Sequence, residues 1–540
     1  MFMHLFRLTI LAAFMASSFI KAKAAQVLAG DQLAEKQEIV RHIKDEPESL
    51  DPAKVVGLPE AQVLRDLFEG LVNVGASGNI EAGVAQSWHT VDHKRYVFKL
   101  RNNAKWSNGD PVTASDFIYS WQRLVDPKTL SPFAWIAQIA GIANANDIIH
   151  GKLPINKLGV IAPDLHTLII QLDKPVPFFI SLLSNVSLFP VPQKKVKEYG
   201  NNWTKPENLV GNGAFSMQER IVNEKIVLKP NPFYWDYKNT VLSKVTFLPI
   251  NQESAATKRY LAGDIDITES FPKNMYHKLM QDIPDQVYTP DQLGIYYYAF
   301  NTQKPPLNDV RVRLALSYAI DRDIIANKVL GTGEKPAYQL TPNVTTGFKD
   351  IPLHIHALTQ LERNKQAKSW LKEAGYGEKK KLKLTILYNT SENHQNIAIA
   401  IASMWKKVLG AQVYLNNQEW KSYLDSRNTG KFDVVRASWI GDYDDASTFL
   451  SLLTSTHTGN IAKFSCIDYD KLLQIASEET DPIKRNYSYA QAEQLIAKQA
   501  PVAPIYQYTN GRLIKSWVKG YPINNTSDVA YSRSMYILKH

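Results

Sequence analysis

Cysteine is nearly absent from this chain of 540 residues, since Cys466 is the only one. A single cysteine cannot form an internal disulfide, which excludes a small disulfide-stapled scaffold. The stability of the fold must instead come from ordinary burial of apolar side chains, which a chain of this length can supply. We therefore expect Cys466 to be a buried apolar filler.

Long apolar runs are also missing. A membrane-spanning helix needs about 20 apolar residues, and the run Leu8–Met15 is too short. This run follows Arg7 and precedes Ala22–Ala25, which fits the A-x-A rule of signal peptidase. Residues 1–24 are therefore predicted to be a signal peptide cleaved after Ala24. Because no cysteine stands at the cleavage site to carry a lipid, we expect a soluble protein of a Gram-negative periplasm.

Signatures of common enzymes are absent as well. The chain has no G-x-S-x-G elbow, H-E-x-x-H pair or Walker loop, and Gly331–Gly333 lacks the third glycine of a dinucleotide fingerprint. His354 and His356 have no third metal ligand nearby, and the acidic stretch Asp442–Asp445 lacks the glycine of a calcium loop. We expect no catalysis, metal or cofactor. A secreted hydrolase remains an alternative, because triads assembled in space leave weak sequence traces.

The net charge is modest for this size. The formal charge is +10, and removal of Arg7, Lys21 and Lys23 with the signal peptide leaves +7. The densest basic cluster, Lys379–Lys381, directly precedes a strand pattern, so a solvated loop explains it better than a nucleic-acid site. We expect no nucleic-acid partner.

Strand and helix patterns alternate along the chain. Glu38–Ile43 alternates in hydrophobicity like a strand, and Ala61–Leu71 has apolar residues at helical spacing. Strand, helix and strand patterns follow one another over Lys381–Tyr388, Gln395–Val408 and Ala411–Asn416, which predicts a βαβ crossover. Single cores stop growing at roughly 250 to 300 residues, so we expect an α/β protein of two or more domains with clefts between them.

A helix is also predicted after Thr113. Thr113 and Asp116 have the pattern of an N-cap and an acidic first turn, and Phe117, Trp121 and Leu124 then recur at helical spacing. This helix should bury one apolar face.

Five segments together resemble the family 5 extracellular solute-binding proteins. These segments are Lys105–Phe117, Ser120–Arg123, Asn308–Leu316, Asp321–Ile325 and Arg533–Ile537. The similarity extends from about Leu33 to His540, so it covers nearly the whole chain after the predicted signal peptide. It implies a monomeric receptor that captures short peptides and delivers them to the membrane permease of an ABC importer.

The resemblance also implies a fold of the periplasmic binding protein type II kind. Two main lobes would close about a hinge, and an additional lobe would pad the side. Lobe I would comprise residues 25–68, 193–293 and 511–540, lobe II residues 69–192, and lobe III residues 294–510. Two backbone crossings, near Gly294 and Asn510, would form the hinge.

In this family a buried aspartate meets the ammonium of the peptide, and the matching residue is Asp442. A buried carboxylate is costly unless it is paired, so the ligand's ammonium would satisfy it. The alternative is a salt bridge within the lobe. Basic residues meet the peptide carboxylate in the family, and Arg436 and His394 match two of them.

Peptides of different sequence share only their backbone. The receptor is therefore expected to pair with the main chain in a strand-like way and to leave side chains in hydrated pockets. The family match implies backbone partners at Val56–Leu58 and Ser438–Ile440. The implied pocket walls are Phe133, Tyr297, Asn389, Arg427, Trp420, Trp439 and Tyr508. Trp420, Trp439 and Tyr508 also stand out as aromatics in polar loops, although such residues can equally seal a lobe core.

The chain departs from the family pattern at several cleft positions. Leu330 stands where the family has a lysine, and Val56 stands where it has a glutamate. Gly294 and Ile440 occupy the positions of a family disulfide. Because one acid and one base are lost together, the formal charge of the cleft is unchanged while its floor becomes more apolar. The ligand therefore stays open among hydrophobic peptides, a murein peptide and a haem-like molecule.

Overall fold

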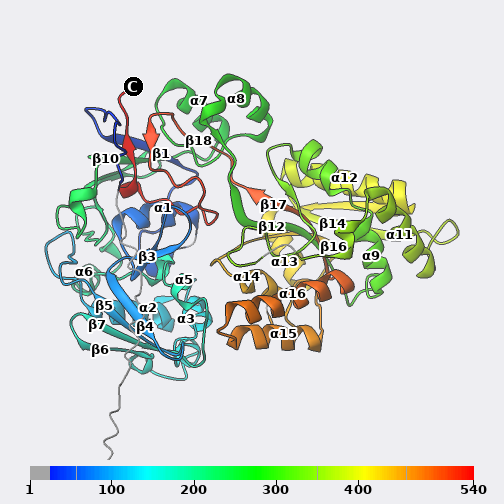
Figure 1. The fold of residues 1–540 in the computed structure, drawn as a ribbon, viewed down its shortest axis with the longest axis horizontal. Coiled ribbons are helices and arrows are strands. Elements are labelled where there is room, and N and C mark those ends of the chain that lie inside the picture. Colours follow the sequence, from blue (N-terminus) through cyan, green and yellow to red (C-terminus); the bar gives the residue numbers. More distant parts are fainter. Residues whose placement is uncertain (1–24, 56, 349–350, 458) are drawn as a thin grey trace, which may run out of the picture.

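The computed structural model describes residues 25–540 except 56, 349–350 and 458. Figure 1 shows two bodies side by side, linked by strands β12 (Asp291–Phe300) and β17 (Val502–Thr509). We call residues 25–290 with 511–540 the first body and residues 291–510 the second body. Within the described ranges, no helix is both long and apolar enough to cross a membrane.

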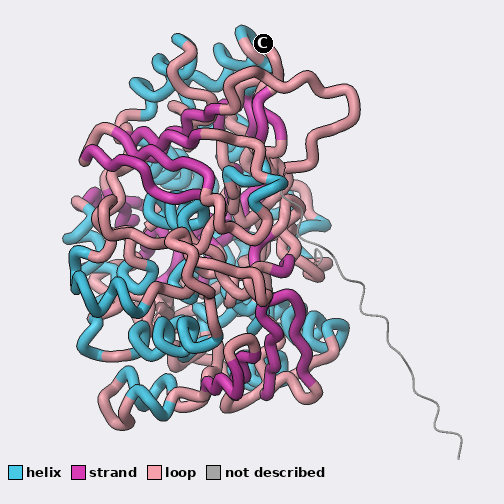
Figure 2. The backbone as a smooth tube through the Cα atoms, turned by 90° about the vertical axis from the view of Figure 1, so that its left-hand side faces the viewer, coloured by secondary structure: helices cyan, strands magenta, loops and turns pink. Residues whose placement is uncertain are grey.

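The first body contains two four-stranded sheets. One has the order β1 (Glu38–Ile43), β10 (Lys244–Pro249), β9 (Lys225–Pro230) and β8 (Phe215–Ile221), and β1 confirms the strand predicted there. The other is antiparallel, in the order β4 (Ala85–Thr90), β5 (Arg95–Leu100), β7 (Thr167–Gln171) and β6 (Val160–Asp164). The short pairs are β2 (Val72–Val74) with β3 (Ile80–Ala82), β11 (Val287–Tyr288) with β18 (Arg512–Leu513), and β19 (Val518–Lys519) with β20 (Tyr536–Ile537). Figure 2 views this body from the side, with strands gathered near its top and its bottom.

Helices cover these sheets. They are α1 (Leu58–Leu67), α2 (Ala114–Val125), α3 (Trp135–Ile139), α4 (Ala145–Ile149), α5 (Phe179–Leu182), α6 (Gln193–Tyr199), α7 (Glu253–Ala262) and α8 (Tyr276–Asp282). The predicted start of α2 is confirmed, since the backbone N–H of Thr113 donates to the Asp116 carboxylate at 2.8 Å. Phe117, Trp121 and Leu124 are buried, as the helical spacing predicted.

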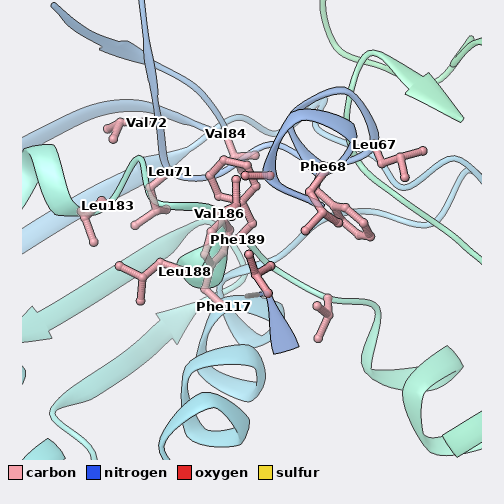
Figure 3. Close-up of a cluster of buried hydrophobic side chains, with 14 of the residues drawn as sticks. Leu67, Phe68, Leu71, Val72, Val84, Phe117, Leu183, Val186, Leu188 and Phe189 are labelled. Carbon is pink, nitrogen blue, oxygen red and sulfur yellow. The ribbon is translucent and has the colours of Figure 1, made fainter. Parts of the chain in front are cut away.

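One continuous apolar cluster joins the two sheets of the first body. Figure 3 shows part of it, where Leu67 and Phe68 lie close to Leu71, Phe117 and Phe189. Because side chains from both sheets fill the same core, separating the sheets would expose a large apolar surface to water. The first body is therefore expected to move as a unit.

The second body is built on a six-stranded mixed sheet. Its order is β13 (Lys335–Pro336), β17, β12, β16 (Val434–Ile440), β14 (Lys383–Asn389) and β15 (Gln412–Gln418). Its helices are α9 (Val310–Tyr318), α10 (Arg322–Ile324), α11 (Gln360–Glu373), α12 (Glu392–Leu409), α13 (Trp420–Thr429), α14 (Ser447–Leu450), α15 (Ile467–Glu478) and α16 (Pro482–Gln499). The βαβ crossover is confirmed, because α12 joins the parallel pair β14 and β15. This body has its own apolar core.

Two local predictions are wrong. The helix predicted over Ala61–Leu71 instead runs from Leu58 to Leu67. It begins earlier because Pro59 fits the first turn of a helix, and it ends where Phe68 takes up an extended conformation. Cys466 is half-exposed and not a buried filler, because it lies at the surface-facing start of α15.

The two strands that connect the bodies pair with each other and with β16. Asp291 pairs with Thr509 and Ile295 with Gln507, with an irregularity between the two pairs. On the other side of β12, Gly294 pairs directly with Ile440. A Cβ atom on Gly294 would lie 2.5 Å from the Cδ1 atom of Ile440, so the two positions face each other across the ladder.

This register predicts that a disulfide can form in the double variant Gly294→Cys with Ile440→Cys. The bridge would close a long loop, so it should stabilise the fold by about 2 to 4 kcal/mol. Intact mass without reductant should show the loss of two thiol hydrogens, and urea unfolding should show a higher midpoint that reductant reverses. Two free thiols after mild oxidation would contradict the register, and the wild type with Cys466 alone is the control.

Candidate ligand-binding cleft

Three strands of the second body end at the same edge of its sheet. β14 runs parallel to both β15 and β16, so their carboxyl ends lie together. Asn389 ends β14, Ile440 ends β16, and Asp442 follows two residues later. In open α/β sheets, ligands bind at the carboxyl ends of such strands. This edge is therefore the candidate cleft wall on the second body.

The last part of β16 has one free strand edge. β14 pairs with β16 at Val434 and Val435 only, whereas β12 pairs along the whole length of β16. The edge from Arg436 to Ile440 that faces away from β12 therefore has no partner strand in the described ladder. Ser438 is half-buried and Ile440 is 44% exposed. Such an edge can accept an extended peptide by main-chain hydrogen bonds.

Arg436 is a buried cation whose polar contacts are all neutral. Its Nη1 donates to the Asn389 amide oxygen at 3.4 Å, and its Nη2 donates to the Tyr508 hydroxyl at 3.2 Å. The guanidinium lies 4.8 Å from the ring centroid of Tyr296, and its Nε has no partner among the described residues. No described carboxylate lies within 4 Å of it. A buried charge without a counter-ion is costly, so this site favours an anionic group.

Arg436, Asn389, Tyr508 and Tyr296 form what we call the Arg436 cluster. His394 lies beside this cluster, near the start of α12. Its ring is 5.6 Å from that of Tyr296, and burial, followed by the charges of Arg436 and Lys273, lowers the pKa of His394 to about 3. The imidazole is therefore neutral at pH 7 in the ligand-free protein. It can still donate one hydrogen bond to a ligand carboxylate.

Asp442 is the one member of its acidic stretch without a partner in the described part of the chain. Asp444 accepts hydrogen bonds from Thr346, and Asp445 lies 3.6 Å from Arg485. Among the residues that the structure describes, no cation or hydrogen-bond donor lies within reach of the Asp442 carboxylate. Its side chain is open to solvent, yet the surrounding protein atoms reduce its hydration enough to raise its pKa to about 6. The group is suited to meet a ligand cation.

Three predicted pocket residues lie around α13. Tyr297 is buried and pairs with Ala437, so it points to the sheet face opposite Arg436. The Arg427 guanidinium lies 5.8 Å from the ring of Tyr423, and Trp420 begins the helix. Tyr297 and Arg436, two of the predicted ligand-binding residues, therefore lie on opposite faces of the sheet.

The other predicted residues lie apart from the Arg436 cluster. The Trp439 indole N–H donates to Thr448 at 3.3 Å, close to Asp442. On the first body, the ring centroids of Phe133 and Trp135 lie 5.4 Å apart. Leu58, at the start of α1, is 58% exposed. Val56 lies outside the described residues. A ligand that contacts Arg436 would also have to reach Trp439, Phe133 and Leu58 for these predicted residues to share one site.

The comparisons with known proteins decide the family. The sequence model described as bacterial extracellular solute-binding proteins, family 5 Middle, matches residues 79–460. The chain belongs to this family. It is 66% identical over 528 residues to the periplasmic murein peptide-binding protein MppA of Escherichia coli K12, covering 98% of each chain. It is 47% identical to the periplasmic oligopeptide-binding protein OppA of Salmonella typhimurium LT2, again over 98% of each chain.

A solved structure of a family 5 relative has the same fold. The unliganded open form of the MppA murein tripeptide-binding protein superposes with a TM-score of 0.86 at 66% identity, covering 95% of this chain and 99% of that one. The fold is therefore the type II-like α/β fold of the periplasmic binding proteins, as predicted. Both named relatives are described as peptide-binding proteins.

This family 5 protein has a cavity of about 610 Å³ beside its connecting strands. Lys273 and His277 of the first body line it, opposite Leu330 of the second body and Tyr508 of β17. Lys273 also forms an ion pair with the buried Glu334, which joins the two bodies. Sequence reasoning missed Lys273 and Tyr296, because only the folded chain brings them beside His394.

The raised pKa of Asp442 has a consequence for stability. Because its folded pKa lies above the ordinary 3.8, the folded state binds the proton more tightly than the unfolded chain does. The stabilisation from Asp442 is therefore present below its ordinary pKa and lost as the pH rises through about 6. Asp442→Asn should raise the thermal midpoint of the ligand-free protein at pH 7.5, on the order of 1 °C, and leave it unchanged at pH 4.

Scanning calorimetry at the two pH values measures this difference. Asp444→Asn is the comparison variant, because the Asp444 carboxylate accepts hydrogen bonds from Thr346 and the Asp442 carboxylate does not. A midpoint for Asp442→Asn at or below that of the wild type at pH 7.5 would show that the carboxylate is not desolvated.

Proposed function

We propose that this chain is the periplasmic receptor of an ABC peptide importer and that murein peptides are its preferred ligands. The proposal depends on one observation, which is that two charges in one cleft have no counter-ion among the described residues. They are the exposed carboxylate of Asp442 and the buried guanidinium of Arg436. A zwitterionic peptide supplies both missing counter-ions. The 66% identity to a murein peptide-binding protein supports the choice among peptides.

In the proposed complex, the ligand ammonium meets Asp442 and a ligand carboxylate meets Arg436 and His394. The main chain of the ligand pairs with the free edge of β16 from Ser438 to Ile440, and Val56–Leu58 of the first body approach from the other side. Leu330 replaces the lysine that the family has at one depth of the cleft, so a ligand carboxylate has fewer positions at which it can meet a basic side chain. This arrangement favours a short ligand of defined length.

Closure of the two bodies would bury the ligand. We propose the lobes as residues 25–68 with 193–293 and 511–540, 69–192, and 294–510, with the hinge near Gly294 and Asn510. In support of this, Gly294 lies in β12 and Asn510 directly follows β17. The closed monomer would then dock on the membrane permease of the importer.

Export to the periplasm is part of the proposal. The predicted signal peptide, residues 1–24, lies outside the described residues, and cleavage would follow Ala24. The names of the curated relatives place them in the periplasm. We propose the same compartment for this chain.

Binding of a murein tripeptide should weaken at low pH. With a pKa of about 6, roughly one tenth of the Asp442 carboxyl is ionised at pH 5 and nine tenths at pH 7. Only the ionised form pairs with the ammonium, so the affinity by titration calorimetry should be about tenfold lower at pH 5. Asp442→Asn should bind weakly and lose this pH dependence, whereas Asp444→Asn should keep it. A wild type that binds no murein tripeptide, or binds it equally at both pH values, would refute the proposal.

A further inference from the structure

One residue of the second body is buried in the core of the first. Tyr443 is 9% exposed and is the only described residue between 294 and 510 that belongs to the large apolar cluster of the first body. Its ring stacks on that of Phe178, with centroids 4.4 Å apart and planes inclined by 15°. Phe178 directly precedes α5, and Figure 1 shows α5 and α14 on facing sides of the two bodies.

Tyr443 is the next residue after Asp442, so the stack and the carboxylate share one short loop. Contacts within the second body hold this loop from one side. The Gly441 N–H donates to the Leu293 carbonyl at 2.8 Å, and the Asp442 N–H donates to the Thr448 hydroxyl at 3.3 Å. The Phe178 ring holds the same loop from the first body. The position of Asp442 is therefore set by both bodies at once.

Elsewhere the bodies are joined by the two neighbouring strands and, beside those strands, by the ion pair of Lys273 with Glu334. Rotation about two adjacent crossings would move a free loop relative to the first body. The docked ring limits that movement at Asp442, and it does so in a structure that resembles an unliganded open form. An aromatic pair with a buried ring costs free energy to separate. The Asp442 end of the cleft is thus already assembled before closure.

We propose that the Phe178–Tyr443 stack positions the Asp442 carboxylate for the ligand's ammonium. Phe178 is then a positioning residue, and the sheet formed by β4 to β7 contributes to recognition through it without touching the ligand. The inference rests on the proposed function, in which Asp442 meets an ammonium.

The test compares wild type with Phe178→Ala for binding of one short peptide and of its N-acetylated form. Phe178→Ala should weaken binding of the free amine about 3- to 10-fold, the range expected from the loss of one aromatic pair. It should leave binding of the acetylated peptide unchanged, because that ligand makes no ion pair with Asp442. Phe178→Tyr should restore the wild-type values. Phe233→Ala, at a 42% exposed phenylalanine of the same body, is the matched control and should change neither affinity.

A second readout needs no ligand. Carbon-detected NMR titration should find the pKa of Asp442 near 6 in the wild type and closer to its ordinary value in Phe178→Ala, because the released loop moves the carboxylate away from the protein atoms that reduce its hydration. The pKa is read from the NMR signals of folded molecules only. An unchanged pKa together with an unchanged free-amine affinity would overturn the inference.

The outcomes separate the two proposals. Equal weakening of both peptides by Phe178→Ala would mean that the stack only supports closure, which overturns the positioning role while peptide binding stands. A wild type that binds both peptides equally would instead refute the pairing of Asp442 with an ammonium. The positioning role would then fall with the proposed function.

Discussion

Two charges of opposite sign in the cleft have no counter-ion among the described residues, and the remaining features of the site serve to hold them in that state. Arg436 is buried among hydroxyl, amide and aromatic groups, and Asp442 has no described cation near it. Either group would be neutralised cheaply by one nearby side chain of opposite charge. Neither group has such a partner among the described residues, so a ligand that carries both charges can supply the two counter-ions.

The architecture explains how the charges stay separated. Both lie on one strand and the loop that follows it, so the sheet fixes their spacing, and the free edge of β16 between them can pair with an extended main chain. From the first body, Phe178 stacks on Tyr443 in the loop that carries Asp442. In the proposed complex, the ligand would lie along β16 and be enclosed by the first body.

Local patterns in the sequence predicted much of the fold. The cap at Thr113 and the spacing of the apolar residues after it identified α2, and alternating runs identified the crossover around α12. The bounds of α1 were wrong because Phe68 is buried by tertiary packing after the helix has ended. Periodicity alone cannot distinguish those two ways of burying a side chain.

The cleft residues could not be predicted from local patterns. Asp442 and Arg436 were identified by family resemblance, and their lack of partners is a property of the folded chain. Tyr443 was missed because nothing in its own segment indicates that it packs against Phe178, which lies far away in the sequence. Contacts between distant segments leave no periodic signal in either one.

The most direct test of this account is a double cycle that removes the same ion pair from each side. Calorimetry would measure the affinity of wild type and Asp442→Ala for one short peptide and for its N-acetylated form, with thermal melting as the folding control. Each single change should weaken binding by roughly 30-fold to 3,000-fold, the usual effect of truncating a buried charge pair. Together they should weaken it little more than either alone, because both break one interaction. Additive losses would show that Asp442 and the ligand ammonium do not meet.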